Sequence, residues 1–295
     1  NETQLYEAFS RSSFLANTIL HKPQLLSDIL AHQPSKEPLK HYKTRLSAVL
    51  QDTSNEDALF EALRKFRNQE MASITFFDVL NKQSIEESLK HVSALADTLV
   101  TGAYYWLYES LAIRYGKPVG EDGDMHMYIL GMGKLGGGEL NFSSDIDLIF
   151  AYPEKGSTQG GRKTLENQQF FTKLAQKLIQ ALNKITNDGQ VYRVDMRLRP
   201  FGDSGPLVMH FAALEDYYQD QGRHWERFAM VKARVLNDDD SADVKWLKSI
   251  LHPFTFRRYL DFTTIDALRN MKKLIATEIR RRRLSNNIKL GAGGI

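Results

Sequence analysis

The sequence predicts an α+β protein that is predominantly helical, with a small β core between an N-terminal and a C-terminal helical region. Two observations support this fold class. Apolar residues recur at helical spacing through the first 120 residues and again after residue 212, whereas the runs suited to strands are concentrated between them. We therefore expect three parts: a helical region over 1–120, a core over 121–212 and a helical region over 213–295.

The N-terminal region carries helical patterns separated by polar breaks. Apolar side chains keep the helical period through residues 5–30, and prolines interrupt it within residues 32–38. Ser84, with Glu87 three residues later, is typical of a helix N-terminus, and this helix should run towards Gly116. No convincing strand is expected before residue 120. Further helices are expected over about 38–51, 55–68 and 70–81.

The most distinctive stretch of the chain runs from Met127 to Phe150. It predicts an apolar strand, a glycine-rich turn and a second apolar strand that opens at Ser144. Gly116–Asp124, just before it, has the composition of a linker. The turn contains the spacing G-x-G-x-x-G, but residues 137–144 are too few for the crossover helix of a dinucleotide-binding unit.

Four kinds of element are expected after the second strand. Residues 165–186 repeat apolar side chains at helical spacing and predict an amphipathic helix. Residues 191–200 alternate charged and apolar side chains, which predicts a third strand with its charged residues on one face. Residues 201–206 predict a turn and 207–211 a short extended segment. Helical patterns follow from residue 212 onward, through 223–236, 241–260 and 263–284.

Paired carboxylates point to a metal site. Asp145 and Asp147 lie two positions apart on the second strand, so their side chains share one face, where two like charges repel each other. A divalent cation relieves this repulsion, and oxygen ligands favour Mg²⁺. Asp195 offers a third carboxylate on the third strand. Most isolated Asp-x-Asp pairs are merely solvated, but this one also follows glycines whose backbone can approach a phosphate.

Three arginines share the predicted strand face of Asp195, namely Arg193, Arg197 and Arg199. Guanidinium groups bind phosphate oxygens bidentately, so this face suits a phosphate-bearing substrate. The alternative is a solvent-facing strand with alternating ion pairs, which contribute little to stability. The residues together predict a metal-dependent phosphoryl or nucleotidyl transfer site.

Composition limits the remaining classes of protein. The chain has no cysteine, which excludes disulfides and thiolate metal sites, and its formal net charge of +3 is too small to indicate nucleic-acid binding. No apolar run is long enough to span a bilayer, and no signal peptide is recognisable. We expect a cytoplasmic protein without membrane association. Because the chain lacks an initial Met and stops in a glycine-rich loop at Ile295, we also expect a fragment truncated at its C-terminus.

Several motifs resemble those of a known family. The glycines, the Ser-Asp-Ile-Asp run and a later acid resemble the nucleotidyltransferase superfamily signature. Longer stretches resemble the bifunctional glutamine synthetase adenylyltransferase/adenylyl-removing enzymes, over about residues 125–295. These stretches are Gly131–Phe150, Tyr192–Gly202, Ala213–Tyr218 and Lys289–Ile295. The resemblance implies a small mixed β-sheet nucleotidyltransferase core.

That family carries two related halves on one chain. The run from Asn141 to Asp147 resembles the N-terminal, adenylyl-removing half, whereas the adenylylating half tends to read Gly-Tyr-Gly-Ser-Asp-Leu-Asp. The resemblance implies Mg²⁺-dependent phosphorolysis of adenylyl-tyrosine on glutamine synthetase, which releases ADP and reactivates the synthetase in nitrogen regulation. The implied partners are adenylylated glutamine synthetase, a PII-type signal protein, phosphate, ADP or ATP, and glutamine as an effector of the full-length enzyme.

The resemblance also implies roles for individual residues. One or two Mg²⁺ ions would be held by Asp145, Asp147 and Asp195. The nucleotide phosphate would be positioned by Gly136, Gly137, Gly138 and Ser144, and the incoming phosphate by Arg193, Arg197 and Arg199. Three alternatives stay open: the adenylylating half, a catalytically silent domain that binds a nucleotide or a partner, and an RNA-directed nucleotidyltransferase, against which the weak net charge argues.

Overall fold

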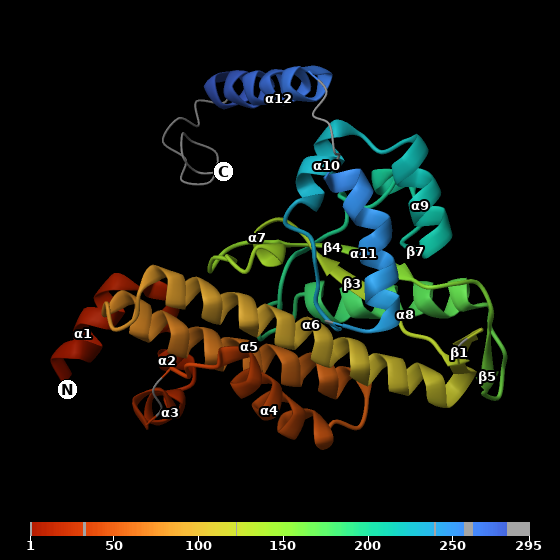
Figure 1. Ribbon diagram of the computed structural model, residues 1–295. Coiled ribbons are helices and arrows are strands. Elements are labelled where there is room, and N and C mark those ends of the chain that lie inside the picture. The colour runs from red at the N-terminus through yellow and green to blue at the C-terminus, as the bar shows by residue number, and fades with distance from the viewer. Residues whose placement is uncertain (1, 32–33, 122, 239, 257–261, 282–295) are drawn as a thin grey trace.

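The computed structural model describes residues 2–31, 34–121, 123–238, 240–256 and 262–281. Two long helices, α5 (Glu56–Val79) and α6 (Ile85–Tyr115), lie alongside each other, and the strands β3 (Tyr128–Gly131) and β4 (Ile146–Tyr152) lie over α6 (Figure 1). The described part of the chain consists mostly of helices, with a three-stranded sheet and a mixed five-stranded sheet, which confirms the α+β, predominantly helical fold class. No helix in the described part of the chain is both long and apolar enough to cross a membrane.

The N-terminal helices begin where local capping predicts. Ser84 accepts a hydrogen bond from the backbone N–H of Glu87, and the Glu87 carboxylate accepts one from the backbone N–H of Ser84, so the expected capping box at the start of α6 is confirmed. Asn55 caps α5 in the same way through the N–H of Ala58. The preceding helices are α1 (Glu2–Arg11), α2 (Ser13–His21), α3 (Leu25–Ala31) and α4 (Pro38–Gln51).

Two expectations about this region are wrong. The two helices expected over 55–68 and 70–81 are the single helix α5, because no glycine or proline separates them. Glu70, near the expected break, is buried and forms an ion pair with Arg45, with 2.6 Å between carboxylate and guanidinium. The expected linker at Gly116–Asp124 forms the strands β1 (Gly116–Gly120) and β2 (Gly123–Asp124). β2 pairs with β1, and β1 pairs on its other edge with β5 (Ser157–Gly160), a distant segment that composition alone does not reveal.

The central sheet has the strand order β6-β4-β3-β8, with β7 also paired to β4. β3 and β4 are antiparallel, which agrees with the exclusion of a dinucleotide-binding crossover. β4 is parallel to β6 (Val194–Asp195) and to β7 (Val208–His210), so the sheet is mixed. On its other edge β3 pairs with β8 (Arg234–Val235), a strand within the segment 223–236 that was expected to be helical.

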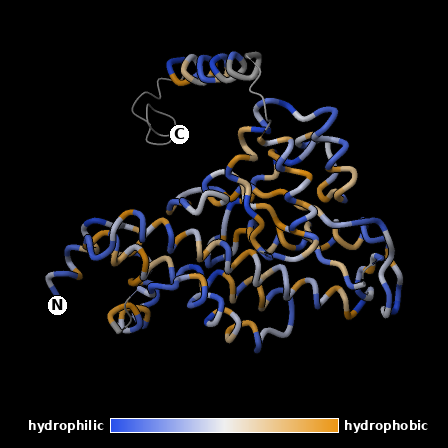
Figure 2. The backbone as a smooth tube through the Cα atoms, viewed as in Figure 1, coloured by the Kyte–Doolittle hydropathy of each residue, from blue (hydrophilic) through white to orange (hydrophobic). Residues whose placement is uncertain are grey.

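The two faces of this sheet are buried by different helices. Alternate residues of β3 and β4 divide between two apolar clusters, with Ile129 and Phe150 in one and Leu130 and Ile149 in the other. The first cluster includes α5, α6 and α8 (Asn167–Asn183), and the second includes α9 (Phe211–Asp220) and α11 (Ala242–Thr255). Hydrophobic segments follow these two layers in Figure 2. The sheet is therefore the shared wall of both cores.

The third strand is shorter than the alternating pattern suggested. Only Val194–Asp195 pairs as β6, and the chain then turns, with the N–H of Arg199 bonded to the carbonyl of Met196 at 3.3 Å. Arg197 and Arg199 thus belong to a turn and do not share a strand face with Asp195, because a proline at position 200 and glycines at 202 and 205 follow directly. The described elements not yet named are α7 (Gly133–Gly136), η1 (Gly202–Ser204), α10 (His224–Met230) and α12 (Phe262–Arg281).

Candidate functional site

The strand pairing brings two of the predicted carboxylates next to each other. In the parallel register of β4 and β6, Asp147 lies opposite Asp195, and the N–H of Ile146 donates to the carbonyl of Arg193 at 3.0 Å. Asp145 precedes β4 directly, two positions before Asp147. Asp147 and Asp195 are therefore cross-strand neighbours, and Asp145 lies just before the same end of β4.

The glycine-rich turn begins against one of these aspartates. The N–H of Met132 donates to the carbonyl of Asp147 at 2.9 Å, and Gly133 opens α7 with a φ of +54°. A Cβ at Gly133 would lie 3.3 Å from the Asp147 carboxylate oxygen Oδ2. Among the glycines of the turn, Gly133 is the one whose Cβ position meets a site aspartate, whereas the sequence predicts this role for Gly136, Gly137 and Gly138. Several glycines stand in a row here, and the sequence alone does not show which one meets the aspartate.

The three predicted phosphate-binding glycines have their backbone N–H groups engaged inside the turn. The acceptors are Met132 O for Gly136, Gly133 O for Gly137 and Leu135 O for Gly138, each at 3.1 Å. Gly136 is required by packing, since a Cβ there would lie 2.0 Å from the carbonyl oxygen of Lys232. In this conformation the three glycines shape the turn, and their N–H groups do not point outward to a ligand.

Two of the predicted arginines contact the carboxylates. Arg193 forms an ion pair with Asp145, and Arg197 donates from Nε to Asp195 Oδ2 at 2.9 Å. This hydrogen bonding by Arg197 holds the pKa of Asp195 below its usual value. Both guanidinium groups are mostly in solvent, with side-chain exposures of 67% for Arg193 and 74% for Arg197. Because the guanidinium groups are exposed, these ion pairs contribute little to the stability of the fold.

Arg199 and Ser144 have different surroundings. The side chain of Arg199 is 11% exposed and donates to the carbonyl of Met196 at 2.7 Å, with Asp203 at 3.4 Å, so it holds the turn after β6. The hydroxyl of Ser144 donates to the side chain of Asn141 and lines the same cavity as Asp145. Of the predicted phosphate-binding side chains, Arg193 and Ser144 therefore border the cavity at the start of β4.

The carboxylates suit Mg²⁺ by their chemistry and backbone placement. They offer oxygen ligands only, which Mg²⁺ prefers. Within the described ranges, no three His, Asp or Glu side chains are grouped as metal ligands, because Asp145 and Asp195 face their arginines. Holding the ion would require these two side chains to turn from the arginines towards Asp147.

One anchor of the turn is absent from the sequence predictions. Arg234 of β8 donates to the carbonyls of Leu135 at 3.1 Å and Gly136 at 3.3 Å, and its guanidinium lies 2.9 Å from the carboxylate of Asp97 on α6. Asp97 is buried, with an 8% exposed side chain. The long helix α6 thus fixes the end of α7 through Arg234. The pairing of such distant residues has no local sequence pattern.

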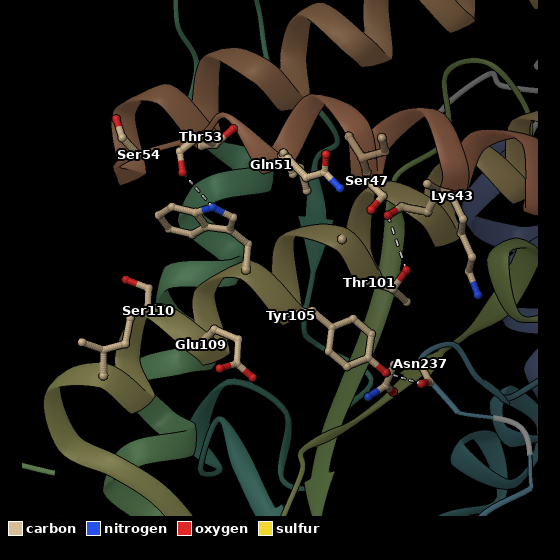
Figure 3. A pocket seen from close by; sticks show the side chains of 16 residues that line it. Lys43, Ser47, Gln51, Thr53, Ser54, Thr101, Tyr105, Glu109, Ser110 and Asn237 are labelled. Carbon is tan, nitrogen blue, oxygen red and sulfur yellow. Dashed lines mark hydrogen bonds between the residues drawn. The ribbon is translucent and has the colours of Figure 1, made fainter. Parts of the chain in front are cut away.

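A larger cavity lies elsewhere, between α4 and α6, with a volume of about 710 Å³ (Figure 3). Tyr105 crosses one end and donates to the carbonyl of Asn237 at 2.7 Å, and Trp106 donates to the carbonyl of Thr53 at 3.3 Å. None of the site aspartates or arginines lines this cavity. It is therefore separate from the carboxylate site.

Comparison with known proteins gives consistent results. A family model described as glutamate-ammonia ligase adenylyltransferase matches residues 2–249. A bifunctional glutamine synthetase adenylyltransferase/adenylyl-removing enzyme of Alteromonas mediterranea is 71% identical over 315 residues, which cover 99% of this chain and 32% of the relative. The chain thus spans about a third of the length of this curated relative. The similarity includes the N-terminal helices, where the sequence motifs were least specific.

Proposed function

The chain belongs to the glutamate-ammonia ligase adenylyltransferase family, and we propose that it removes adenylyl groups from glutamine synthetase by phosphorolysis. The observation that carries this proposal is the pairing of Asp147 with Asp195 beside Asp145 and Gly133. The run from Asn141 to Asp147 supports the removing half rather than the adenylylating half. A function in nitrogen regulation, in the cytoplasm and under a PII-type signal protein, forms part of the same proposal.

The proposed reaction is a displacement at phosphorus. An oxygen of inorganic phosphate attacks the adenylyl phosphorus, the bond from phosphorus to the tyrosine oxygen breaks, and the tyrosine takes up a proton. The products are ADP and free tyrosine. Negative charge accumulates on the phosphoryl oxygens during this step, so cationic groups that face them accelerate it.

The residues of this chain have distinct proposed roles. Asp145, Asp147 and Asp195 would hold one or two Mg²⁺ ions, which supply positive charge to the reacting phosphoryl group. Arg193 and Arg197 would leave their carboxylates for phosphate oxygens, because their exposed side chains are free to reorient. Gly133 keeps the space beside Asp147 open. Arg199 would act indirectly, by holding the turn that carries Arg197.

The proposal is tested by incubating adenylylated glutamine synthetase with the chain, Mg²⁺ and phosphate, and measuring ADP. We expect ADP that depends on phosphate and that disappears in the double variant Asp145→Asn/Asp147→Asn. Asp52→Asn, at an exposed position after α4, is the matched control and should retain activity. Folding of the double variant is checked by its melting temperature, which should be unchanged or higher because carboxylate repulsion is relieved.

Adenylylation is a second candidate activity, because the name of the Alteromonas relative covers both reactions and the chain spans only about a third of that protein. The same assay with unmodified synthetase and ATP measures AMP transfer. Transfer without any phosphate-dependent ADP would show that the chain is the adenylylating half. Binding of Mg²⁺-nucleotide without either product would indicate a catalytically silent domain.

A further inference from the structure

A polar cavity of about 190 Å³ lies beside Asp145, where the N-terminal helices meet the sheet. Two of its walls are the segments that lead into β4 and β6, residues 142–145 and 190–193. A third wall is Arg67 of α5. The cavity therefore joins the carboxylate site to a helix to which no site role has been assigned.

Two of the residues that line this cavity carry a buried polar group without a hydrogen-bond partner in the described part of the chain: the Nε of Arg67 and the hydroxyl of Tyr192. Tyr192 as a residue is only 5% exposed. Both residues line the cavity, and the charge of Arg67 opposes the rise that burial causes in the pKa of Tyr192. Buried polar groups are nearly always hydrogen-bonded in folded proteins, so two unsatisfied donors at one cavity indicate a ligand that accepts hydrogen bonds.

The charges and donors of the cavity select an anion. An arginine side chain only donates hydrogen bonds, and Arg67 and Arg193 both contribute positive charge. The single carboxylate of the lining, Asp145, is already ion-paired with Arg193. One water molecule occupies about 30 Å³ in the liquid, so the cavity of about 190 Å³ has room for a tetrahedral oxyanion and some hydration water.

The guanidinium of Arg67 is held in place from outside the cavity. Its Nη1 donates to the side chain of Asn68 at 3.1 Å, and its Cζ lies 5.9 Å from the ring centre of Phe14. Asn68 in turn donates to the carbonyl of Asp188, in the turn before β6. Because the side chain is already fixed before a ligand arrives, binding a small ion costs little additional side-chain entropy.

We propose that this cavity binds the inorganic phosphate that attacks the adenylyl group, and that Arg67 and Tyr192 are its binding residues. The inference rests on the proposed function and adds that the helical region completes the phosphate site. Phosphate bound here lies against Asp145 and Arg193, on the border of the carboxylate site. Inorganic phosphate and the phosphate of a nucleotide share this chemistry, so the test separates them.

The test compares Arg67→Gln and Tyr192→Phe with the control Lys65→Gln. Lys65 lies on α5, is exposed and pairs with Glu61, so its loss removes the same charge outside the cavity. The first measurement is the rise in melting temperature caused by sodium phosphate relative to sodium chloride at equal ionic strength and pH. The second is the KM for phosphate in the ADP assay.

We expect the phosphate-specific stabilisation in the wild type and in Lys65→Gln, and its loss in Arg67→Gln. The KM for phosphate should rise about ten- to a hundredfold in Arg67→Gln, as for a lost hydrogen bond to a charged group, and less in Tyr192→Phe. Each variant is compared with itself in chloride, so a general loss of stability does not mimic the result.

Other results overturn the proposal. A wild-type protein that is not stabilised by phosphate, or an Arg67→Gln variant with an unchanged KM for phosphate, shows that the cavity is not the phosphate site. Stabilisation by ADP that depends on Arg67, with none by inorganic phosphate, assigns the cavity to the nucleotide instead. Failure of the proposed function is distinguishable, because phosphate stabilisation then persists and depends on Arg67 while no ADP forms.

Discussion

At the scale of single residues, the absence of a side chain at Gly133 leaves space beside the carboxylate of Asp147. Gly133 has a φ of +54°, and its missing Cβ leaves room 3.3 Å from Asp147 Oδ2. Gly138 has a similar φ of +69°, but a Cβ there would meet no atom within 4 Å. Both positions require a positive φ, but only Gly133 lies beside the Asp147 carboxylate. Substitutions at the two positions therefore separate backbone strain from an effect on the carboxylate.

Gly133→Ala should therefore reduce adenylyl removal about tenfold, since a methyl group displaces the Asp147 carboxylate from its place in the site. Gly138→Ala should leave the rate nearly unchanged. Both substitutions place alanine in the left-handed region and should cost about 1–2 kcal/mol of unfolding free energy. Urea unfolding measures that cost, and the ADP assay measures the rate. Equal losses of rate in the two variants would contradict the assigned role of Gly133.

The pair of Arg197 and Asp195 gives a prediction about pH. Hydrogen bonds from Arg197 lower the pKa of Asp195 in the folded protein, so the ionised pair stabilises the fold above the unfolded-state pKa, about 3.9, and this contribution is lost as the pH falls through the lower folded pKa. In Arg197→Gln the folded pKa should return towards the ordinary value. Carboxyl NMR titration of Asp195 measures it, and an identical pKa in both proteins would refute the pairing in solution.

Part of the site follows directly from sequence. The spacing of Asp145 and Asp147 needs only the alternation of a strand, and Asp195 was recognised as a third acid on a later segment. The presence of Arg67 in the cavity beside Asp145 has no local sequence signal, because α5 is distant in sequence and its approach depends on how the helices pack. Local alternation also overestimated the third strand, whose last residues are drawn into a turn.

At the scale of elements, the short helix α7 depends on support from two distant segments. Arg234 of β8 binds its last carbonyls and reaches the buried carboxylate of Asp97 on α6. The backbone of Lys232 packs so closely on Gly136 that no side chain fits there. The position of the glycine-rich turn is thus determined by β8, the strand that helical periodicity concealed.

Arg234→Gln should lower the unfolding free energy by about 3 kcal/mol, because Asp97 loses its arginine in a buried position. Asp97→Asn added to that variant should restore part of the loss, since no buried carboxylate remains. The coupling between the two positions is read from urea unfolding of both single variants and the double variant. Additive losses would show that the ion pair contributes nothing of its own.

The helices and strands also show why some sequence patterns predict the structure correctly and others do not. The capping box at Ser84 is a local arrangement of four residues, and it was predicted correctly. The strand β1 is stabilised by pairing with β5, which lies about forty residues later, and β2 pairs with β1, so their own composition suggested a linker. Helix α5 continues through the break expected near residue 69, because no glycine or proline interrupts it there.

At the scale of the whole molecule, the central sheet couples two apolar cores. One core joins residues from Tyr42 in the helical region to Leu236, and the other continues to Phe254. Buried Arg64 adds a polar link, since its guanidinium donates to the carbonyls of Ala181 and Gly189 at 3.1 and 3.0 Å. The boundaries expected near residues 120 and 212 therefore cross shared cores, and the three-part division stays a prediction about the sequence.

This arrangement predicts that the two cores unfold together, because the strands β3, β4 and β7 each contribute residues to both cores. Trp106 packs against the first core, and Trp246 contacts Phe211 of the second with 5.0 Å between ring centres. In two single-tryptophan variants, each retaining one of these residues, urea unfolding followed by fluorescence should give the same midpoint. If Trp246 reported an earlier transition than Trp106, the α9–α11 layer would be a separate folding unit. Coincident midpoints would mean that the carboxylate site, which lies on the shared sheet, forms only when both cores are folded.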